Sequence, residues 1–267
     1  MFVDNINPVL LQLGPFGIRY YGLVYAIGFL TTYFVLKNAI KKGRLRLKEE
    51  QLDVFFIWLV AGVIVGARVF EVLFFSFNYY YANPPAIFMI WNGGLSFHGG
   101  LVGAVVVSLI FCRKYRVQFY DLADLTVIPL SFFLFLGRVA NFTNSEIYGK
   151  IANPNSTPWC VVFAKVDSYC RHPAQLYEGL SNLFTMFVLI SYRAWEKKRR
   201  KERKERVKGR VFWLFVFLYG LLRFFIDFYR EDVLYFGLSM GQWLSLIMVI
   251  AGTAFLLRLR KNSKINK

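Results

Sequence analysis

The feature that most constrains this chain is a series of long apolar blocks separated by polar segments. Apolar residues make up 57% of the chain, whereas soluble domains contain about 45–50%. A helix needs about 20 mostly apolar residues to cross a hydrocarbon core, and continuous apolar runs exclude the alternating pattern of a membrane barrel. The sequence therefore predicts an all-α integral membrane protein, a bundle of about seven transmembrane helices. The predicted spans are Tyr20–Leu36, Val54–Phe77, Gly93–Phe111, Phe119–Gly137, Pro173–Tyr192, Val211–Phe228 and Val233–Leu257.

Basic residues gather in every second loop. The chain carries 33 Lys and Arg against 16 Asp and Glu, a formal charge of +17. Of the 33, 25 lie in the segments 37–48, 113–116, 193–210 and 258–267. Because cytoplasmic loops are enriched in Lys and Arg, we expect the N-terminus outside and the C-terminus in the cytoplasm. Topology accounts for the positive charge, so the sequence does not indicate nucleic-acid binding.

The same topology defines the expected domain organisation. No internal repeat or linker divides the sequence, so residues 1–267 are expected to form a single polytopic membrane domain. Its outer loops lie near 78–92 and 138–172. The basic cytoplasmic loop near 193–210 is expected to be solvated and to touch anionic lipid headgroups. Residues 1–12 lack the basic region of a cleavable signal peptide, so the first span should remain as an anchor.

Eight basic residues lie outside the cytoplasmic segments, and all map to the outer half of the membrane or to the outer loops. Charge at membrane depth costs at least about 2.5–3.5 kcal/mol, so it is usually paired or functional. Arg68 with Glu71, and Arg223 with Asp227, are spaced for pairing along one helix. Guanidinium groups bind phosphate bidentately, which suggests a site for a phosphate-bearing lipid headgroup. The eight residues are Arg19, Arg68, Arg138, Lys150, Lys165, Arg171, Arg223 and Arg230.

Three local patterns bear on such a site. His98 opens the run His-Gly-Gly-Leu-Val-Gly, where it could accept a proton at neutral pH or be a structural histidine at a tight helix crossing. The segment Gly137–Gly149 is dense in hydrogen-bonding groups, more than helix capping requires. Arg19–Gly22 begins the first span, where interfacial tyrosines are ordinary.

With three further segments, these patterns make the chain resemble the bacterial prolipoprotein diacylglyceryl transferases over essentially its whole length. The thirteen-residue segment Gly137–Gly149 is the most specific. Ser145 stands where a glycine is common in the family, Tyr148 where a tryptophan is often found, and Asp227 where glutamate is frequent. The matching segments are Tyr21–Gly22, Trp91–Gly100, Gly137–Gly149, Arg171–Glu178, Tyr219–Arg223 and Ser239–Gln242.

The resemblance implies a reaction and a location. Enzymes of this family transfer the diacylglyceryl group of phosphatidylglycerol to the lipobox cysteine of a prolipoprotein, at its signal peptide. A thioether forms and glycerol phosphate leaves, in the first step of lipoprotein maturation. The chain would be a multi-pass protein of the bacterial inner membrane, with its active site toward the periplasm or outer leaflet and with membrane lipids around it.

The resemblance also implies roles for individual residues. Arg138 and Arg223 would grip the phosphodiester and stabilise the leaving phosphate, and His98 would receive the thiol proton. The remaining positions would bind or orient the headgroup, with Gly149 permitting a backbone turn and with Tyr219 and Arg230 at the outer mouth of the site. These substrate-binding positions are Tyr21, Arg138, Asn141, Glu146, Gly149, Tyr219 and Arg230.

Other chemistries find little support in the sequence. With two histidines, no Cys-x-x-Cys and no glycine-rich phosphate loop, neither a metal site nor a nucleotide site is expected. Phosphatidylglycerol is a cosubstrate, and no further cofactor is implied. Cys160 and Cys170 share an outer loop and could form a disulfide in an oxidising compartment, whereas Cys112 lies toward the cytoplasm.

Two other functions stay open on the residues alone. Buried arginines also serve transporters or flippases for anionic lipids, although no inverted repeat is evident. A non-catalytic lipid-binding scaffold is the weaker alternative.

Overall fold

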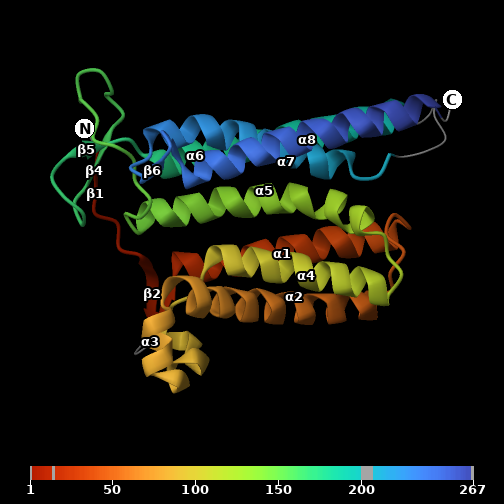
Figure 1. Cartoon of the computed structure of the whole chain (residues 1–267), viewed down its shortest axis with the longest axis horizontal. Coiled ribbons are helices and arrows are strands. Elements are labelled where there is room, and N and C mark those ends of the chain that lie inside the picture. Colours follow the sequence, from red (N-terminus) through yellow and green to blue (C-terminus); the bar gives the residue numbers. More distant parts are fainter. Residues whose placement is uncertain (1, 14–15, 200–206, 266–267) are drawn as a thin grey trace. The chain divides into compact units, whose positions relative to one another are not determined.

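A computed structural model describes residues 2–13, 16–199 and 207–265 and separates the chain into two compact units. Unit 1 comprises Met1–Thr32 and Ala123–Lys267, and unit 2 comprises Tyr33–Leu122. Long helices dominate both units, as Figure 1 shows.

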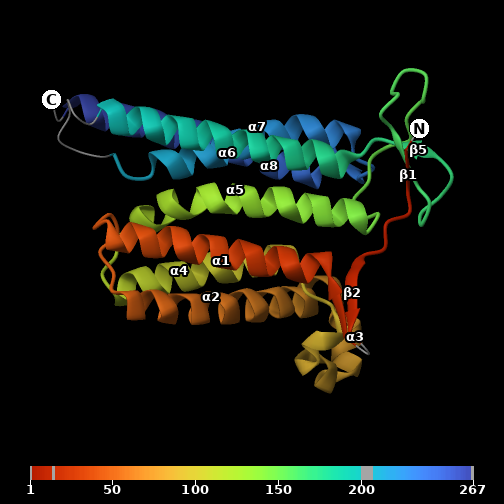
Figure 2. The same ribbon diagram turned by 180° about the vertical axis from the view of Figure 1, so that it is seen from behind.

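Unit 2 is built on two helices that pack side by side, α2 (Glu49–Phe70) and α4 (Phe97–Lys114), beside the second half of α1 (Tyr20–Lys41) (Figure 2). A π-helix, η1 (Glu71–Phe75), continues α2. The predicted outer loop near 78–92 is helical, with α3 (Phe77–Ala82) followed by the 3-10 turns η2 (Pro84–Phe88) and η3 (Ile90–Asn92).

Glycines determine how closely α2 and α4 pack. A Cβ at Gly103 would overlap the carbonyl oxygen of Gly62, and one at Gly99 would overlap that of Gly66. Each helix therefore presents two glycines four residues apart, the small-residue spacing that lets membrane helices approach closely. The glycines after His98 thus lie at a tight helix crossing.

Unit 1 holds α5 (Phe119–Thr143), α6 (Ala174–Arg199), α7 (Arg210–Ile226) and α8 (Met240–Ile265). Helix α7 packs against both α6 and α8 (Figure 1). The buried side chains of Val127, Leu189, Val211 and Phe215 form a core between α5, α6 and α7.

A buried carboxylate fixes where α7 begins. Asp124 accepts hydrogen bonds from the backbone N–H groups of Gly209 and Phe212, both at 2.9 Å. These are among the donors that the start of a helix leaves without intrahelical partners. The cap therefore joins the beginnings of α5 and α7 at the end of unit 1 that carries the basic segments.

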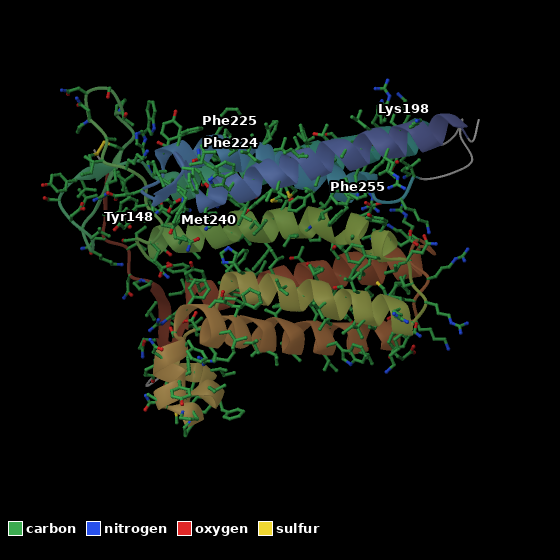
Figure 3. All side chains as sticks on the ribbon, in the orientation of Figure 1. Tyr148, Lys198, Phe224, Phe225, Met240 and Phe255 are labelled. Atoms are coloured by element: carbon green, nitrogen blue, oxygen red, sulfur yellow. A yellow bond between two sulfur atoms is a disulfide. The ribbon has the colours of Figure 1, made fainter. Side chains whose placement is uncertain are left out.

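The opposite end of unit 1 carries small sheets and the 3-10 turn η4 (Asp227–Tyr229). In the largest sheet β1 (Phe2–Asp4) pairs in parallel with β4 (Val161–Phe163), and β4 pairs antiparallel with β5 (Cys170–Arg171). Cys160 and Cys170 are joined in a disulfide, drawn as a yellow bond in Figure 3. The other strands form two hairpins: β2 (Val9–Leu13) with β3 (Phe16–Arg19), and β6 (Leu234–Tyr235) with β7 (Leu238–Ser239).

The structure confirms the predicted class, an all-α membrane protein, but it does not confirm the predicted number of seven spans. Six helices in the described part of the chain are long and apolar enough to cross a membrane. The fifth predicted span does form a helix, α6, but four buried polar side chains lower its hydropathy. They share one face of the helix and are Gln175, Glu178, Asn182 and Thr185.

Several predicted boundaries differ from the structure, and two of these differences concern segments that carry candidate site residues. Helix α4 begins at Phe97 rather than Gly93, because Gly93 and Gly94 have positive φ angles that end any helix there. Helix α5 continues through Arg138 and Asn141 to Thr143 rather than ending at Gly137, which places both side chains on helical turns.

Candidate active site

Three arginines of unit 1 converge on one buried carboxylate, that of Glu178 near the beginning of α6. Its Oε2 accepts a hydrogen bond from Arg223 Nη1 and forms an ion pair with Arg138 Nη2 at 2.8 Å. Its Oε1 accepts one from Arg230 Nη1 at 2.8 Å. Glu178 is 2% exposed. We call Arg138, Arg223 and Arg230, with Glu178 between them, the arginine cluster.

Two more carboxylates border the arginine cluster. Asp227, which is buried, lies 3.2 Å from Arg223 Nε and 3.7 Å from Arg230 Nε. Asp232 accepts from Arg230 Nε at 2.8 Å. Burial opposes the charge of Arg230, but its bonds to Asp232 and Glu178 outweigh this and raise its pKa above the ordinary arginine value. Arg230 therefore stays charged, and with Arg138 and Arg223 it forms a set of guanidinium groups oriented by one carboxylate.

A second network extends from the arginine cluster through Arg138. Its Nη1 donates to Asn141 Oδ1 at 3.1 Å, one turn further along α5. Asn141 Nδ2 donates to the hydroxyl of Tyr21, which in turn donates to Glu146 Oε2 at 3.0 Å. Four of the predicted positions thus form one hydrogen-bonded chain, and α1, α5 and the loop after α5 supply its members.

The loop after α5 needs an unusual backbone. Ser145 and Ile147 both have φ near +57°, in the left-handed region that favours glycine. The Ser145 hydroxyl donates to Asp4 Oδ2 at 2.9 Å, and both residues are buried. Ser145 is thus held by a hydrogen bond to β1.

Gly149 allows two backbone segments to meet. Its N–H donates to the carbonyl of His172 at 2.9 Å, and it pairs with Arg230 in an isolated β-bridge. A Cβ there would overlap the carbonyl oxygen of Tyr229. Gly149 does not have a positive φ angle, so its role is this close approach rather than the predicted turn. The contact holds the backbone next to Arg230 in place.

Ion pairs brace the outer sheet beside the site. Arg171 Nη2 donates to Asp167 at 2.6 Å, and Arg171 Nη1 donates to Glu231 at 2.6 Å. The hydrogen bond from Arg171 lowers the pKa of Asp167 and raises that of Arg171.

Burial lowers the pKa of His172, whose Nδ1 lies 3.1 Å from the Tyr177 hydroxyl. His172 is therefore neutral at physiological pH.

Unit 2 carries His98 and a buried arginine. His98 is exposed in the first turn of α4, and no hydrogen bond to its ring is found among the described residues. Arg68 is 6% exposed and donates to the Tyr80 hydroxyl and, at 2.9 Å, to the Met89 carbonyl. The expected pairing of Arg68 with Glu71 does not form, because Glu71 accepts from Ser76 instead.

The comparison with known proteins identifies the family. A model of the family described as prolipoprotein diacylglyceryl transferase matches residues 8–258. The chain belongs to this family. Relatives named phosphatidylglycerol–prolipoprotein diacylglyceryl transferase include the one from Bordetella parapertussis, 40% identical over 95% of this chain and 95% of its own. Those from Rickettsia canadensis (37% identical, 96% and 98% covered) and Geobacter sulfurreducens (36%, 94% and 95%) are similar along nearly their whole length.

The structure of this diacylglyceryl transferase family member brings most of the predicted site residues together in unit 1. Arg138, Arg223 and Arg230 meet at Glu178, and Arg138 leads to Asn141, Tyr21 and Glu146. Tyr219 lies one turn before Arg223 on α7 and packs against Phe215, with ring centroids 5.8 Å apart. His98 belongs to unit 2.

Glu178, the ion-pair partner of Arg138, was not among the predicted site residues. A signal was present, because Gln175, Glu178 and Asn182 are spaced three and four residues apart within a predicted span. A polar stripe at helical spacing in a membrane helix faces the protein interior, and an ionisable member of it marks a functional site by default. In the described residues no group of three or more His, Cys, Asp or Glu is placed to hold a metal ion.

Proposed function

We propose that the arginine cluster is where this transferase binds the phosphodiester of phosphatidylglycerol and transfers its diacylglyceryl group to the lipobox cysteine of a prolipoprotein. The proposal rests on the observation that Arg138 and Arg223 contact the same carboxylate, that of Glu178 near the beginning of α6. Each arginine side chain stays 15–17% exposed, so each retains an accessible edge. Guanidinium edges are suited to phosphate oxygens.

In the proposed reaction, the cysteine sulfur attacks the glycerol carbon that carries the phosphate. The sulfur–carbon bond forms, the carbon–oxygen bond breaks, and its electron pair leaves on the oxygen of glycerol phosphate. Because negative charge builds on the departing phosphate, oriented cations in a poorly solvated site stabilise the transition state. Arg138 and Arg223 take this role.

The thiol must lose its proton, because the thiolate is the nucleophile and is scarce at neutral pH. We propose His98 as the group that receives the proton, since its ring has no hydrogen bond within the described part of the chain and lies in the first turn of α4. Tyr21, Asn141 and Glu146 hold Arg138 in position through their hydrogen-bonded chain. Phosphatidylglycerol is the cosubstrate, and no further cofactor takes part.

The proposed setting is the bacterial inner membrane, where residues 1–267 form a polytopic membrane domain. Helix α6 serves as a seventh span, since its polar stripe is buried and most of its other side chains from Leu176 to Ile190 are apolar. The basic ends of α6, α7 and α8 lie at the end of unit 1 opposite the sheets (Figure 1). By the positive-inside rule that end is cytoplasmic, so the arginine cluster faces the outer leaflet, the N-terminus lies outside and the C-terminus lies inside.

A purified-protein assay tests the proposal. The full chain in detergent is incubated with phosphatidylglycerol and a lipobox peptide, and mass spectrometry follows a diacylglyceryl adduct on the peptide cysteine. We expect the adduct with the native chain, its loss in Arg138→Ala and Arg223→Ala, and normal yield in Arg258→Ala, an exposed arginine at the far end of α8. Full activity without Arg138 and Arg223 would contradict the site, and lipid transport without peptide modification would favour a flippase.

A further inference from the structure

The carboxylate of Glu178 lies where an anion bound by the three arginines would lie. Both of its oxygens are occupied by guanidinium groups from α5, α7 and the segment after η4. Because the side chain is 2% exposed, these contacts are not weakened by water as surface ion pairs are. Glu178 therefore fixes the positions of all three guanidinium groups before any lipid binds.

The charges of the cluster nearly cancel. Three guanidinium groups face the carboxylates of Glu178, Asp227 and Asp232, of which the first two are buried and the third is 31% exposed. Nη2 of Arg223 has no hydrogen-bond partner among the described residues. An incoming phosphate thus finds directed N–H donors but little net positive charge.

This balance acts differently on substrate and product. The phosphodiester of a phospholipid carries one negative charge. Breaking its carbon–oxygen bond produces a phosphomonoester, which carries about 1.5 to 2 negative charges at neutral pH because its second pKa is about 6. A buried carboxylate between the arginines repels the product more strongly than the substrate.

From this arrangement we infer that Glu178 is a positioning residue that also sets the charge of the site, so that the site holds a singly charged phosphodiester and releases the phosphomonoester. The inference rests on the proposed function, because it assigns the arginine cluster to the phosphate of the lipid. It predicts that two different substitutions of Glu178 separate the effect of its charge from the effect of its geometry.

The experiment measures kcat, KM for phosphatidylglycerol and Ki for added glycerol phosphate with the purified full chain, at pH 8 and pH 5.5. In Glu178→Gln the carboxylate charge is lost, so Ki should fall about tenfold at pH 8 while KM does not rise. The fall should be smaller at pH 5.5, where the phosphomonoester carries closer to one charge. In Glu178→Asp the charge remains, but the side chain is one methylene shorter and no longer holds the arginines in place. We therefore expect kcat to fall while Ki stays near the native value.

Thr185→Val is the matched control, because Thr185 is buried on the same stripe of α6 and, among the described residues, its hydroxyl bonds only the Ser181 carbonyl. Its constants should equal the native ones. Asp227→Asn removes a buried carboxylate that borders the arginine cluster, and it should also lower Ki. For a variant whose turnover is too slow for Ki to be measured, the dissociation constant of glycerol phosphate at equilibrium replaces Ki in the comparison.

An unchanged or raised Ki in Glu178→Gln, with KM raised, would overturn the inference and leave Glu178 a purely structural ion-pair partner. A native chain that forms no peptide adduct would instead refute the proposed function. The two failures are therefore distinguishable.

Discussion

Arg138 takes part in two networks. One of its nitrogens forms an ion pair with Glu178 at 2.8 Å, and another donates a hydrogen bond to Asn141 at 3.1 Å. A lysine would keep the charge but offers a single point charge in place of the planar fork. In Arg138→Lys we expect kcat/KM to fall about 10- to 100-fold, the effect of losing one charged hydrogen bond. Initial rates of peptide modification measure it, Arg258→Lys is the control, and a native rate would contradict the dual role.

His98 provides a second test at this scale. Glutamine keeps the approximate size and polarity of the side chain but cannot accept a proton at neutral pH. Since general-base catalysis contributes about 10²–10⁴-fold, His98→Gln should lower kcat by at least about 10²-fold and leave KM for phosphatidylglycerol within about twofold. Steady-state kinetics with varied lipid separate the two constants. Unchanged turnover would remove His98 from the mechanism.

Residue identities were predictable from the sequence where a type of side chain carries the chemistry. Arginines in apolar spans were recognisable because buried charge is rare, and Arg138 and Arg223 do meet at one carboxylate. The partner Glu178 was not predicted, because it is 40 residues from Arg138 and only folding brings them together. The left-handed backbone conformation of Ser145 was not predicted either, because a serine in a sequence rarely indicates this conformation.

At the scale of elements, the α2–α4 pair depends on the absence of side chains. A Cβ at Gly103 would overlap the Gly62 carbonyl, so Gly103→Val must push the helices apart. We expect a loss of about 1–3 kcal/mol, the usual cost of overpacking, seen as a lower unfolding temperature in detergent. Gly137→Ala is the control, because nothing lies within 4 Å of a Cβ there. Equal stability of both variants would contradict the close packing.

The disulfide stabilises the outer sheet. Cys160 and Cys170 are ten residues apart and lie directly before β4 and in β5. Closing a loop of this length contributes about 2–3 kcal/mol in the chain-entropy treatment. Reduction should therefore speed hydrogen exchange at the amides of Val161, Val162 and Phe163. The Cys160→Ser, Cys170→Ser double variant should not respond to the reductant, and free thiols in the untreated chain would refute the bond.

Elements were predictable to the extent that hydropathy marks them. Every predicted span coincides largely with a helix, because a long apolar run in lipid has no other way to satisfy its backbone. The strands were not predicted. Strand β1 has three residues, and its partner β4 lies 159 positions later in the sequence. No local sequence pattern therefore indicates this strand.

At the scale of the whole molecule, the orientation can be tested by labelling. Lys198 lies at the basic end of α6 (Figure 3), and Asn155 is exposed in the loop before β4. In a Cys112→Ser background, an impermeant maleimide should label Asn155→Cys in intact spheroplasts. It should label Lys198→Cys only after permeabilisation. The reverse pattern would place the arginine cluster on the cytoplasmic side and contradict the proposed reaction.

The parallel pairing of Phe2 with Val161 sets an order for biogenesis. On the proposed topology, the segment that carries Phe2 must wait, already translocated, until α5 has been inserted and the segment that carries Val161 has been translocated after it. Nascent chains arrested before this point should leave the amino terminus open to added protease, and longer ones should protect it. A bulky fusion at the amino terminus should therefore slow maturation of the enzyme more than the same fusion at the carboxyl terminus.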